Sequence, residues 1–283
     1  MLPLFLLLAF AAVSEKTVND GYGDYVLVPA GPFKMGDNFG DGEARERPVH
    51  VVDLDSYYIG KYEITNGEWR KFRDDPGYND PKFWPEGRVM PKEQIPYWTM
   101  AINHGGGTPS SDNYPVLGVN WDGATAYCNW LSAKTGKKYR LPTEAEWEKA
   151  ARGTDQRKYP WGNTIDKTYA NYVGSQKFDT GQLVGYYDGS NREGFQTHNG
   201  ASPYGAFDMA GNVMEWCSDW YSRDYYTVSP RKNPKGPESG AYRVVRGGTF
   251  FMEPLDQRAY LRGAGWPSLQ SHRMTGFRAV REP

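Results

Sequence analysis

Residues 202–221 read SPYGAFDMAGNVMEWCSDWY, and this stretch decides the fold. It combines turn-forming glycine and asparagine, a short apolar run, two carboxylates (Asp208 and Glu215) and two tryptophans. A surface loop carries few aromatic residues, and the interior of a regular strand rarely contains glycine and asparagine. We therefore predict a buried, irregular segment with a bent backbone, in which Trp216 and Trp220 belong to the core.

The composition of the chain sets its fold class. The 283 residues include 10 Trp, 21 Tyr and 12 Phe beside 33 Gly and 20 Pro. Aromatic side chains bury large areas, whereas glycine and proline interrupt helices and strands. We expect an α+β fold with low regular secondary structure, and one domain over residues 19–283, because no repeat or linker divides the chain. A net charge of −1 argues against a nucleic-acid partner held by bulk charge.

The N-terminal run MLPLFLLLAFAAV covers residues 1–13. It is shorter than the roughly 20 apolar residues of a membrane-spanning helix, and it is typical of the apolar part of a secretory signal. Residues 1–18 are therefore expected to be a signal peptide or an N-terminal anchor of an exported protein, periplasmic, secreted or at the cell surface. A buried N-terminal strand is the alternative.

Local patterns predict several elements in the rest of the chain. Strands are expected at 25–29, 32–36, 50–60, 115–120, 242–251 and 274–281, and helices at 65–72, 122–135 and 143–152. Thr65 with Glu68, and Thr143 with Glu146, have the spacing of capping boxes. The long stretch 74–113 is predicted to be an ordered loop, of the kind that often lines a site.

The chain has two cysteines, Cys128 and Cys217. An even number in an exported chain permits a disulfide, but both residues lie in apolar or aromatic surroundings, where free cysteine is a small buried hydrophobe. Both alternatives stay open. The four histidines are scattered, and no nucleotide-binding, nucleophile-elbow or zinc-helix motif is present. Glu144, Glu146 and Glu148 diverge on a helix, so helix capping and the helix dipole explain them better than catalysis.

Four residues within 202–221 could hold a metal ion. Around a bent backbone, the side chains of Asp208 and Glu215 and the carbonyls of Gly211 and Val213 can converge. Hard oxygen ligands in irregular geometry suit Ca²⁺. A turn with a purely structural role is the alternative reading of the same spacing.

The motifs together resemble one known family. GNVMEWCSDWY, RLPTEAEWEKAARG, YPWG, ANY, RVVRGGTFF, GFRAVRE and VPAGPFKMG are similar to the signatures of the formylglycine-generating-enzyme, or sulfatase-modifying-factor, domain. The resemblance covers residues 25–282. It implies a fold of low regular content, related to C-type lectins, with bound Ca²⁺ in several members.

The resemblance also implies particular ligands. One calcium site would use Asp208, the carbonyls of Gly211 and Val213, and Glu215. A second site would begin at Asn171 and Tyr172 and include Asp179. Active members oxidise a substrate cysteine with O₂ and a copper ion held by two cysteine thiolates.

This chain departs from the family at the copper site. Met252 and Gln257 occupy the places of the two thiolates, and Cys128 and Cys217 belong to other motifs. Copper is therefore not expected. Ala279 stands where a family disulfide would place a partner for Cys128, so that bridge is not expected either.

Three functions follow from this departure. The first is a calcium-stabilised binding, accessory or scaffold module for a peptide or protein, with a cleft near Met252, the 74–113 loop and the 188–201 insertion. The second is an enzyme of the same fold with other oxidative chemistry. The third and least favoured is a true formylglycine-generating oxidase. For the second function, the candidate polar groups are Glu253, Asp256, Arg258 and Arg262.

Overall fold

The computed structural model describes residues 16–92, 112–175 and 181–283. Three sequence-based expectations lie outside these residues: the apolar run 1–13, residues 93–111 of the 74–113 loop, and Asp179. The boundary between residues 18 and 19 stays a prediction. In the described part of the chain, no helix combines the length and apolar character needed to cross a bilayer.

Two sheets form the centre of the molecule. The larger has the strand order β1 (Thr17–Asn19), β2 (Asp24–Val28), β5 (Tyr57–Gly60), β13 (Val280–Arg281) and β6 (Tyr139–Arg140), with antiparallel neighbours. The smaller has the order β11 (Gly263–Ala264), β10 (Arg243–Arg246), β9 (Met214–Trp220) and β12 (Thr275–Gly276). In it β12 runs parallel to β9, whereas β10 is antiparallel. The last strands of the chain thus complete both sheets.

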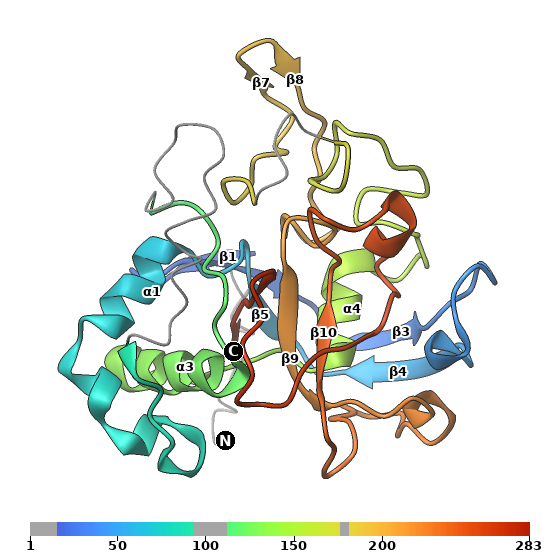
Figure 1. The fold of residues 1–283 in the computed structure, drawn as a ribbon. Coiled ribbons are helices and arrows are strands. Elements are labelled where there is room, and N and C mark those ends of the chain that lie inside the picture. Colours follow the sequence, from blue (N-terminus) through green and yellow to red (C-terminus); the bar gives the residue numbers. More distant parts are fainter. Residues whose placement is uncertain (1–15, 93–111, 176–180) are drawn as a thin grey trace, which may run out of the picture.

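Two hairpin-like ribbons extend from this centre. One pairs β3 (Gly31–Met35) with β4 (His50–Leu54), and the other pairs β7 (Asn191–Arg192) with β8 (Phe195–Gln196). Figure 1 shows α1 and α3 on one side of β9 and β10, the β3–β4 ribbon on the other, and the β7–β8 ribbon projecting at the top.

The helices α1 and α4 begin directly after the predicted N-cap residues, Thr65 and Thr143. The described residues form the α-helices α1 (Asn66–Arg73), α3 (Trp121–Thr135) and α4 (Glu144–Arg152). Thr65 and Thr143 each accept a hydrogen bond from the third residue of their helix, whose glutamate side chain accepts one in return, so both capping boxes are confirmed. Short 3₁₀ helices occur at Ala44–Glu46, Pro76–Asn79, Pro81–Phe83, Pro85–Gly87, Tyr225–Thr227 and Pro254–Gln257.

The core has two parts. Aromatic residues of α1 and α3, among them Trp69, Phe72 and Tyr127, fill the first part. Apolar residues of the β2–β5 and β3–β4 pairs pack on α4 in the second. Cys128 and Cys217 are both buried as free thiols, which settles the open choice between thiols and a disulfide.

The predicted strands are longer than the observed ones. Residues 115–120 form no strand: only Pro115 makes a bridge, with Thr65, because Gly118 takes a positive φ and breaks the extended run. Residues 50–60 divide between β4 and β5, which belong to different sheets. Likewise β10 ends before Gly247, whose φ of 98° turns the chain. At such breaks the chain changes direction while the segment stays apolar. The hydrophobic periodicity of the sequence therefore does not reveal them.

Candidate functional site

The segment between Gly205 and β9 is bent as the sequence predicts. Asp208, Gly211 and Asn212 all have positive φ, at 57°, 82° and 59°. Backbone hydrogen bonds from Gly211 to Gly247 and from Asn212 to Asn171 hold the bend. A Cβ on Gly211 would lie 2.3 Å from the Asn171 carbonyl oxygen, so only glycine fits there. Trp216 is fully buried, but Trp220 is only half-buried, which corrects its placement in the core.

Two buried carboxyl groups meet beside this bend. Asp208 accepts a hydrogen bond from the Gly185 amide at 2.5 Å, and Glu63 lies within hydrogen-bonding reach of Asp208. Burial raises the pKa of Asp208 to about 6, and burial together with the Asp208 charge raises the pKa of Glu63 well above its usual value. Asn212 donates to one Glu63 oxygen at 2.8 Å, while the other, Oε2, is buried without a partner. The raised pKa values show that the surroundings do not neutralise two full negative charges at this pair, so a bound cation would favour its ionised form.

The negative charge of Glu215 is balanced by an arginine. Its carboxylate accepts hydrogen bonds from Arg278 and, at 2.8 Å, from the Trp147 indole. Glu215 and Arg278 are both completely buried, and opposite charges in contact satisfy each other in a site without water. The Glu215 side chain therefore needs no metal to balance its charge.

The chemistry around Asp208 fits Ca²⁺. A carboxylate pair with an unpartnered buried oxygen, beside a bent backbone whose carbonyls can turn inward, is a hard oxygen donor set. Asp208 and Glu63 would hold the ion, with the predicted carbonyls of Gly211 and Val213 from the same bend. Glu215 as a ligand stays a prediction, since Arg278 already occupies both of its oxygens.

Glu63 is a residue that sequence reasoning missed. Its position just before α1 suggests only a helix start, and no local spacing links it to Asp208. The predicted second calcium site adjoins the first: Asn171 accepts the Asn212 amide through its carbonyl, and the Tyr172 amide donates to the Ser175 hydroxyl. With Asp179 outside the described residues, Asn171 and Tyr172 stay predicted ligands.

A cleft of about 420 Å³ is lined by Met252, one of the two positions where the family resemblance implies a thiolate, and not by Gln257. It opens between β10, β11 and the segments that follow them. The residues that line it are Arg45, Met214, Val245, Arg246, Gly247, Gly248, Met252, Asp256, Leu261, Arg262, Gly263, Ala264, Trp266, His272 and Met274. The cleft near Met252 is thus present, although none of the described residues of the 74–113 loop or the 188–201 insertion lines it.

Met252 and Gln257 have different environments. Met252 lines the cleft, whereas Gln257 is buried and its side-chain amide donates to the carbonyls of Thr249, Met252 and Glu253 at 3.1–3.2 Å. Gln257 therefore closes a turn of its own chain. Neither side chain offers a thiolate, and the described cleft residues include no cysteine.

The candidate catalytic groups separate into two kinds. Arg258 forms an ion pair with Asp41, and Arg262 a bidentate one with Glu144, so both serve the structure. Asp256 lines the cleft and accepts the Glu253 amide. His272, which the sequence did not single out, also lines the cleft and stacks on Trp266 with ring centroids 3.8 Å apart. Burial lowers the pKa of His272, so its imidazole is neutral at pH 7.

Exposed apolar side chains lie next to the cleft. Phe251, Leu255 and Leu269 are 45%, 57% and 58% exposed, and each is within three residues of a cleft residue in sequence. Large exposed apolar groups beside a cavity are typical of surfaces that bind another molecule. The cleft thus combines an apolar margin with a few polar groups.

The glutamates of α4 have a role beyond capping. Glu146 closes the capping box, but Glu144 pairs with Arg246 and Arg262, and Glu148 with Arg246 and Arg152. These groups are all buried. The expectation that capping and the helix dipole explain all three glutamates is therefore wrong for Glu144 and Glu148. Arg152 is four residues from Glu148 on the same helix, but Arg246 and Arg262 lie far along the chain, where spacing gives no signal.

Comparison with known proteins finds one family model that covers nearly the whole chain. The model of the sulfatase-modifying factor enzyme 1-like domain matches residues 9–283. A formylglycine-generating enzyme of Thermomonospora curvata is 34% identical over 91% of this chain and 93% of its own. A hercynine oxygenase of Mycolicibacterium smegmatis is 36% identical over 82% of this chain and 55% of its own.

The chain is also similar to a longer protein and to two proteins of known structure. The serine/threonine-protein kinase pkn1 of Chlamydia caviae is 36% identical over 92% of this chain, which spans only 38% of that relative's length. The structure of Treponema denticola variable protein 1 has 26% identity and a TM-score of 0.71, covering 95% of this chain and 99% of its own. PvdO from Pseudomonas aeruginosa has 24% identity and a TM-score of 0.72, covering 94% and 98%, which supports the fold alone.

Proposed function

Because the chain belongs to the sulfatase-modifying factor enzyme 1-like domain family, we propose that it is an exported, calcium-stabilised member that binds a peptide or protein. In this proposal it acts as a binding, accessory or scaffold module and does not generate formylglycine. The α+β fold of low regular content is that of the family. The function rests on the cleft.

The composition of the cleft carries the proposal. Soft thiolates hold Cu(I), and here a thioether, Met252, and a buried amide, Gln257, stand in their places. The fold around them is intact, with the bend at Gly211 and the buried pair of Glu215 and Arg278 in place. A preserved scaffold around an altered metal site supports binding without the oxidase reaction.

The margin of the cleft supports a peptide or protein as the bound molecule. Phe251 and Leu255 are exposed apolar side chains next to Met252 and Asp256. Apolar anchors around a pocket with few polar groups are common in peptide recognition. The relation to pkn1 shows that this type of domain also occurs within a larger protein.

A peptide selection tests the proposal. A random peptide library is selected on the purified protein, and the affinities of the recovered peptides are measured for the wild type and for Phe251→Ser and Leu255→Ser. We expect each substitution to weaken binding about tenfold or more, through lost apolar contact. Val51→Ser is the matched control, because Val51 is 40% exposed on β4, outside the cleft. Peptides that bind both cleft variants like the wild type would contradict the proposal.

The second candidate is an enzyme with other oxidative chemistry. His272 and Asp256 both line the cleft, and the 36% identity to a hercynine oxygenase favours this alternative. Metal analysis separates the two. Calcium alone supports the binding module, whereas copper or iron that is lost in His272→Ala but retained in His50→Ala supports the enzyme. His50 is a suitable control because it lies on β4 and does not line the cleft.

A further inference from the structure

The outer edge of strand β11 lies on the cleft. In the strand order β11, β10, β9, β12 of the smaller sheet, β11 has a neighbour on one side only. Arg262, Gly263 and Ala264 all line the cleft that contains Met252. An edge strand offers main-chain N–H and C=O groups to any chain that can lie beside it. What the cleft can bind therefore depends on which of these groups are free.

The pairing with β10 shows which main-chain groups of β11 point outward. Arg243 turns its main-chain groups toward β11, since its carbonyl accepts the Gly265 amide at 2.9 Å. Because these groups alternate sides along a strand, Val245 also faces β11, where its partner is Gly263. The N–H and C=O groups of Ala264, between these two positions, therefore point away from β10.

The outward groups at Ala264 are unused. At Arg262, two residues earlier and on the same side, the amide donates to Glu46 Oε1 at 3.3 Å, which agrees with this orientation. Within the described part of the chain, the Ala264 amide, the Ala264 carbonyl and the Arg262 carbonyl have no outward partner. Ala264 is also exposed. One donor and two acceptors thus face outward along this edge.

The opposite end of the same sheet is closed. There the Gly118 amide donates to the Thr275 carbonyl of β12 at 3.0 Å, and Thr275 and Gly276 are both buried. A further strand can pair with β12 only if the segment around Gly118 moves away. Of the two ends of this sheet, β11 is therefore the one that another chain can reach.

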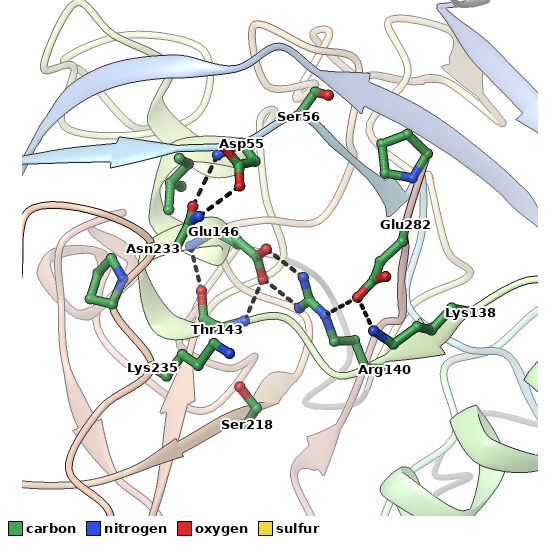
Figure 2. Close-up of a pocket in the computed structure, with 13 residues that line it drawn as sticks. Asp55, Ser56, Lys138, Arg140, Thr143, Glu146, Ser218, Asn233, Lys235 and Glu282 are labelled. Atoms are coloured by element: carbon green, nitrogen blue, oxygen red, sulfur yellow. Dashed lines mark hydrogen bonds and ion pairs between the residues drawn. The ribbon is translucent and has the colours of Figure 1, made fainter.

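The edge strand β6 of the larger sheet is closed in a different way. The Tyr139 amide donates to the Ser132 hydroxyl of α3 at 2.8 Å, so a helix covers this edge. Figure 2 shows the next side chain, Arg140, between Glu146 and Glu282 in a separate cavity of about 640 Å³. Charged side chains and covering helices are the usual protection of a sheet edge, so β6 is not available for pairing.

On the cleft side, β11 presents no side chain at Gly263. Gly263 pairs with Val245, so the two residues share one face of the sheet, and Val245 lines the cleft. A Cβ on Gly263 would lie 2.7 Å from Val245 Cγ2, so no side chain fits at this position. An apolar side chain on a strand beside β11 would therefore meet Val245 directly.

We infer that the cleft takes its peptide as an added strand on β11, in an extended conformation. The peptide main chain accepts the Ala264 amide and donates to the carbonyls of Ala264 and Arg262. In strand addition, the main chain gives affinity and alternate side chains give selectivity. This inference rests on the proposed peptide-binding function.

The occupant is a single extended segment of another protein. The edge of β11 lies in a cleft that Arg45 and Met252 also line, and a single strand fits beside it. A second folded copy would bring its own sheet and the loops around it into the same space. Pairing of two copies is therefore the less suitable alternative.

Backbone N-methylation of a bound peptide tests the mode of binding. A peptide recovered by selection on the purified protein, and weakened by Phe251→Ser, is synthesised with one N-methyl amide at each position in turn. We expect alternate positions of the paired segment to raise the dissociation constant about tenfold or more, because every second amide donates to β11. Equal effects at neighbouring positions, or no effect at any position, would overturn the inference.

A substitution at Ala264 tests the same contact from the side of the protein. Ala264→Pro removes the outward amide, and proline is tolerated on an edge strand where the N–H faces solvent, so the variant should fold. We expect it to bind the peptide about tenfold or more weakly, whereas Ala264→Ser, which keeps the amide, should bind normally. Wild-type affinity in a folded Ala264→Pro variant would overturn the inference.

Hydrogen exchange gives a readout that needs no variant. In the wild type, the exchange of the Ala264 amide, measured by NMR, should slow about tenfold or more when the peptide binds, because the amide then has a partner. Unchanged exchange in the saturated complex would contradict strand addition.

Failure of the function and failure of this binding mode give different results. If no peptide binds the cleft, the proposed function fails, and the inference fails with it. If a peptide binds through Phe251 and Leu255 but tolerates N-methylation at every position, the function stands and addition to β11 is wrong. Dimerisation of the free protein that Ala264→Pro prevents would show that a second copy occupies the edge, and would also contradict the inference.

Discussion

Arg278 and Glu215 form a bidentate ion pair in the interior, with Arg278 Nε and Nη2 each 2.6 Å from a Glu215 oxygen. Arg278 also donates to the backbone carbonyls of Gly60 and Phe207. One guanidinium thus joins β9, the end of β5 and the bend before Asp208. A fully satisfied buried pair costs little, but removal of one partner leaves a buried charge unpaired.

Arg278→Met is therefore expected to lower the free energy of unfolding by about 3–5 kcal/mol. Denaturant unfolding followed by circular dichroism measures the change. Arg73→Met, which removes the exposed pair of Arg73 and Asp74, is the control and should cost less than about 1 kcal/mol. Equal small losses in both variants would show that the buried pair does not hold these elements together.

Calcium is expected to stabilise the protein through Asp208 and Glu63. A ligand that binds only the folded state adds about 2.7 kcal/mol at a hundredfold excess over its dissociation constant. The melting temperature should rise with added CaCl₂ after treatment with chelator, and Asp208→Ala and Glu63→Gln should each abolish the rise.

Asn171→Ala separates the two predicted calcium sites. If the first site alone produces the stabilisation, this variant keeps the calcium-dependent rise in melting temperature. A melting temperature of the wild type that is the same with CaCl₂ and with chelator would contradict a calcium role for Asp208.

Among the glycines of residues 202–221, Gly211 is expected to be the one whose replacement lowers the stability most. Gly211→Ala combines a positive φ with a backbone clash at 2.3 Å, so we expect a loss of about 3 kcal/mol or more. Gly174→Ala has a similar φ of 74° but open space around the new methyl group, and should cost only about 1–2 kcal/mol. Thermal unfolding compares the two, and equal losses would mean that the bend near Asn171 relaxes.

Asp219 is expected to make stability depend on pH. Burial, and then the charge of Glu144, raises the pKa of Asp219 to about 7 from the ordinary value of 3.8. Between these values the folded state binds more protons than the unfolded one, so this group's contribution to stability is lost as pH rises. Relative to the wild type, Asp219→Asn should gain roughly 1–3 kcal/mol between about pH 4 and about pH 8.

Denaturant unfolding at several pH values measures this effect. The asparagine oxygen can still accept the Glu144 amide, which Asp219 accepts at 2.9 Å, so the start of α4 keeps its hydrogen bond. A difference between variant and wild type that does not change with pH would show that Asp219 is not protonated in the folded protein.

Local features of the fold could be predicted from the sequence. The capping boxes at Thr65 and Thr143 depend on neighbouring residues, so short-range chemistry specifies them. Glycine and asparagine also indicate the bend near Gly211, although contacts with Asn171 and Gly247 hold it. The division of residues 50–60 between two sheets could not be predicted, because it depends on pairing with β3 on one side and β2 on the other.

Only some residues of the candidate site could be proposed from the sequence, because local motifs point to some of them and not to others. Asp208 and the cleft at Met252 lie within recognisable motifs. Glu63, His272 and Arg278 join them only through the tertiary fold, where residues distant along the chain meet. Charged residues that seem solvent-exposed in the sequence, such as Glu148, are buried because an arginine elsewhere compensates them.

The proposal that this protein lacks oxidase activity is tested most directly by incubating the purified protein with Cu(I), O₂ and a sulfatase-type cysteine peptide. Mass spectrometry of the peptide, with a formylglycine-generating enzyme as positive control, measures the conversion of cysteine to formylglycine. With Met252 and Gln257 in place of the thiolates, we predict that the peptide remains unmodified. Stoichiometric formylglycine formation would contradict a binding module without oxidase activity.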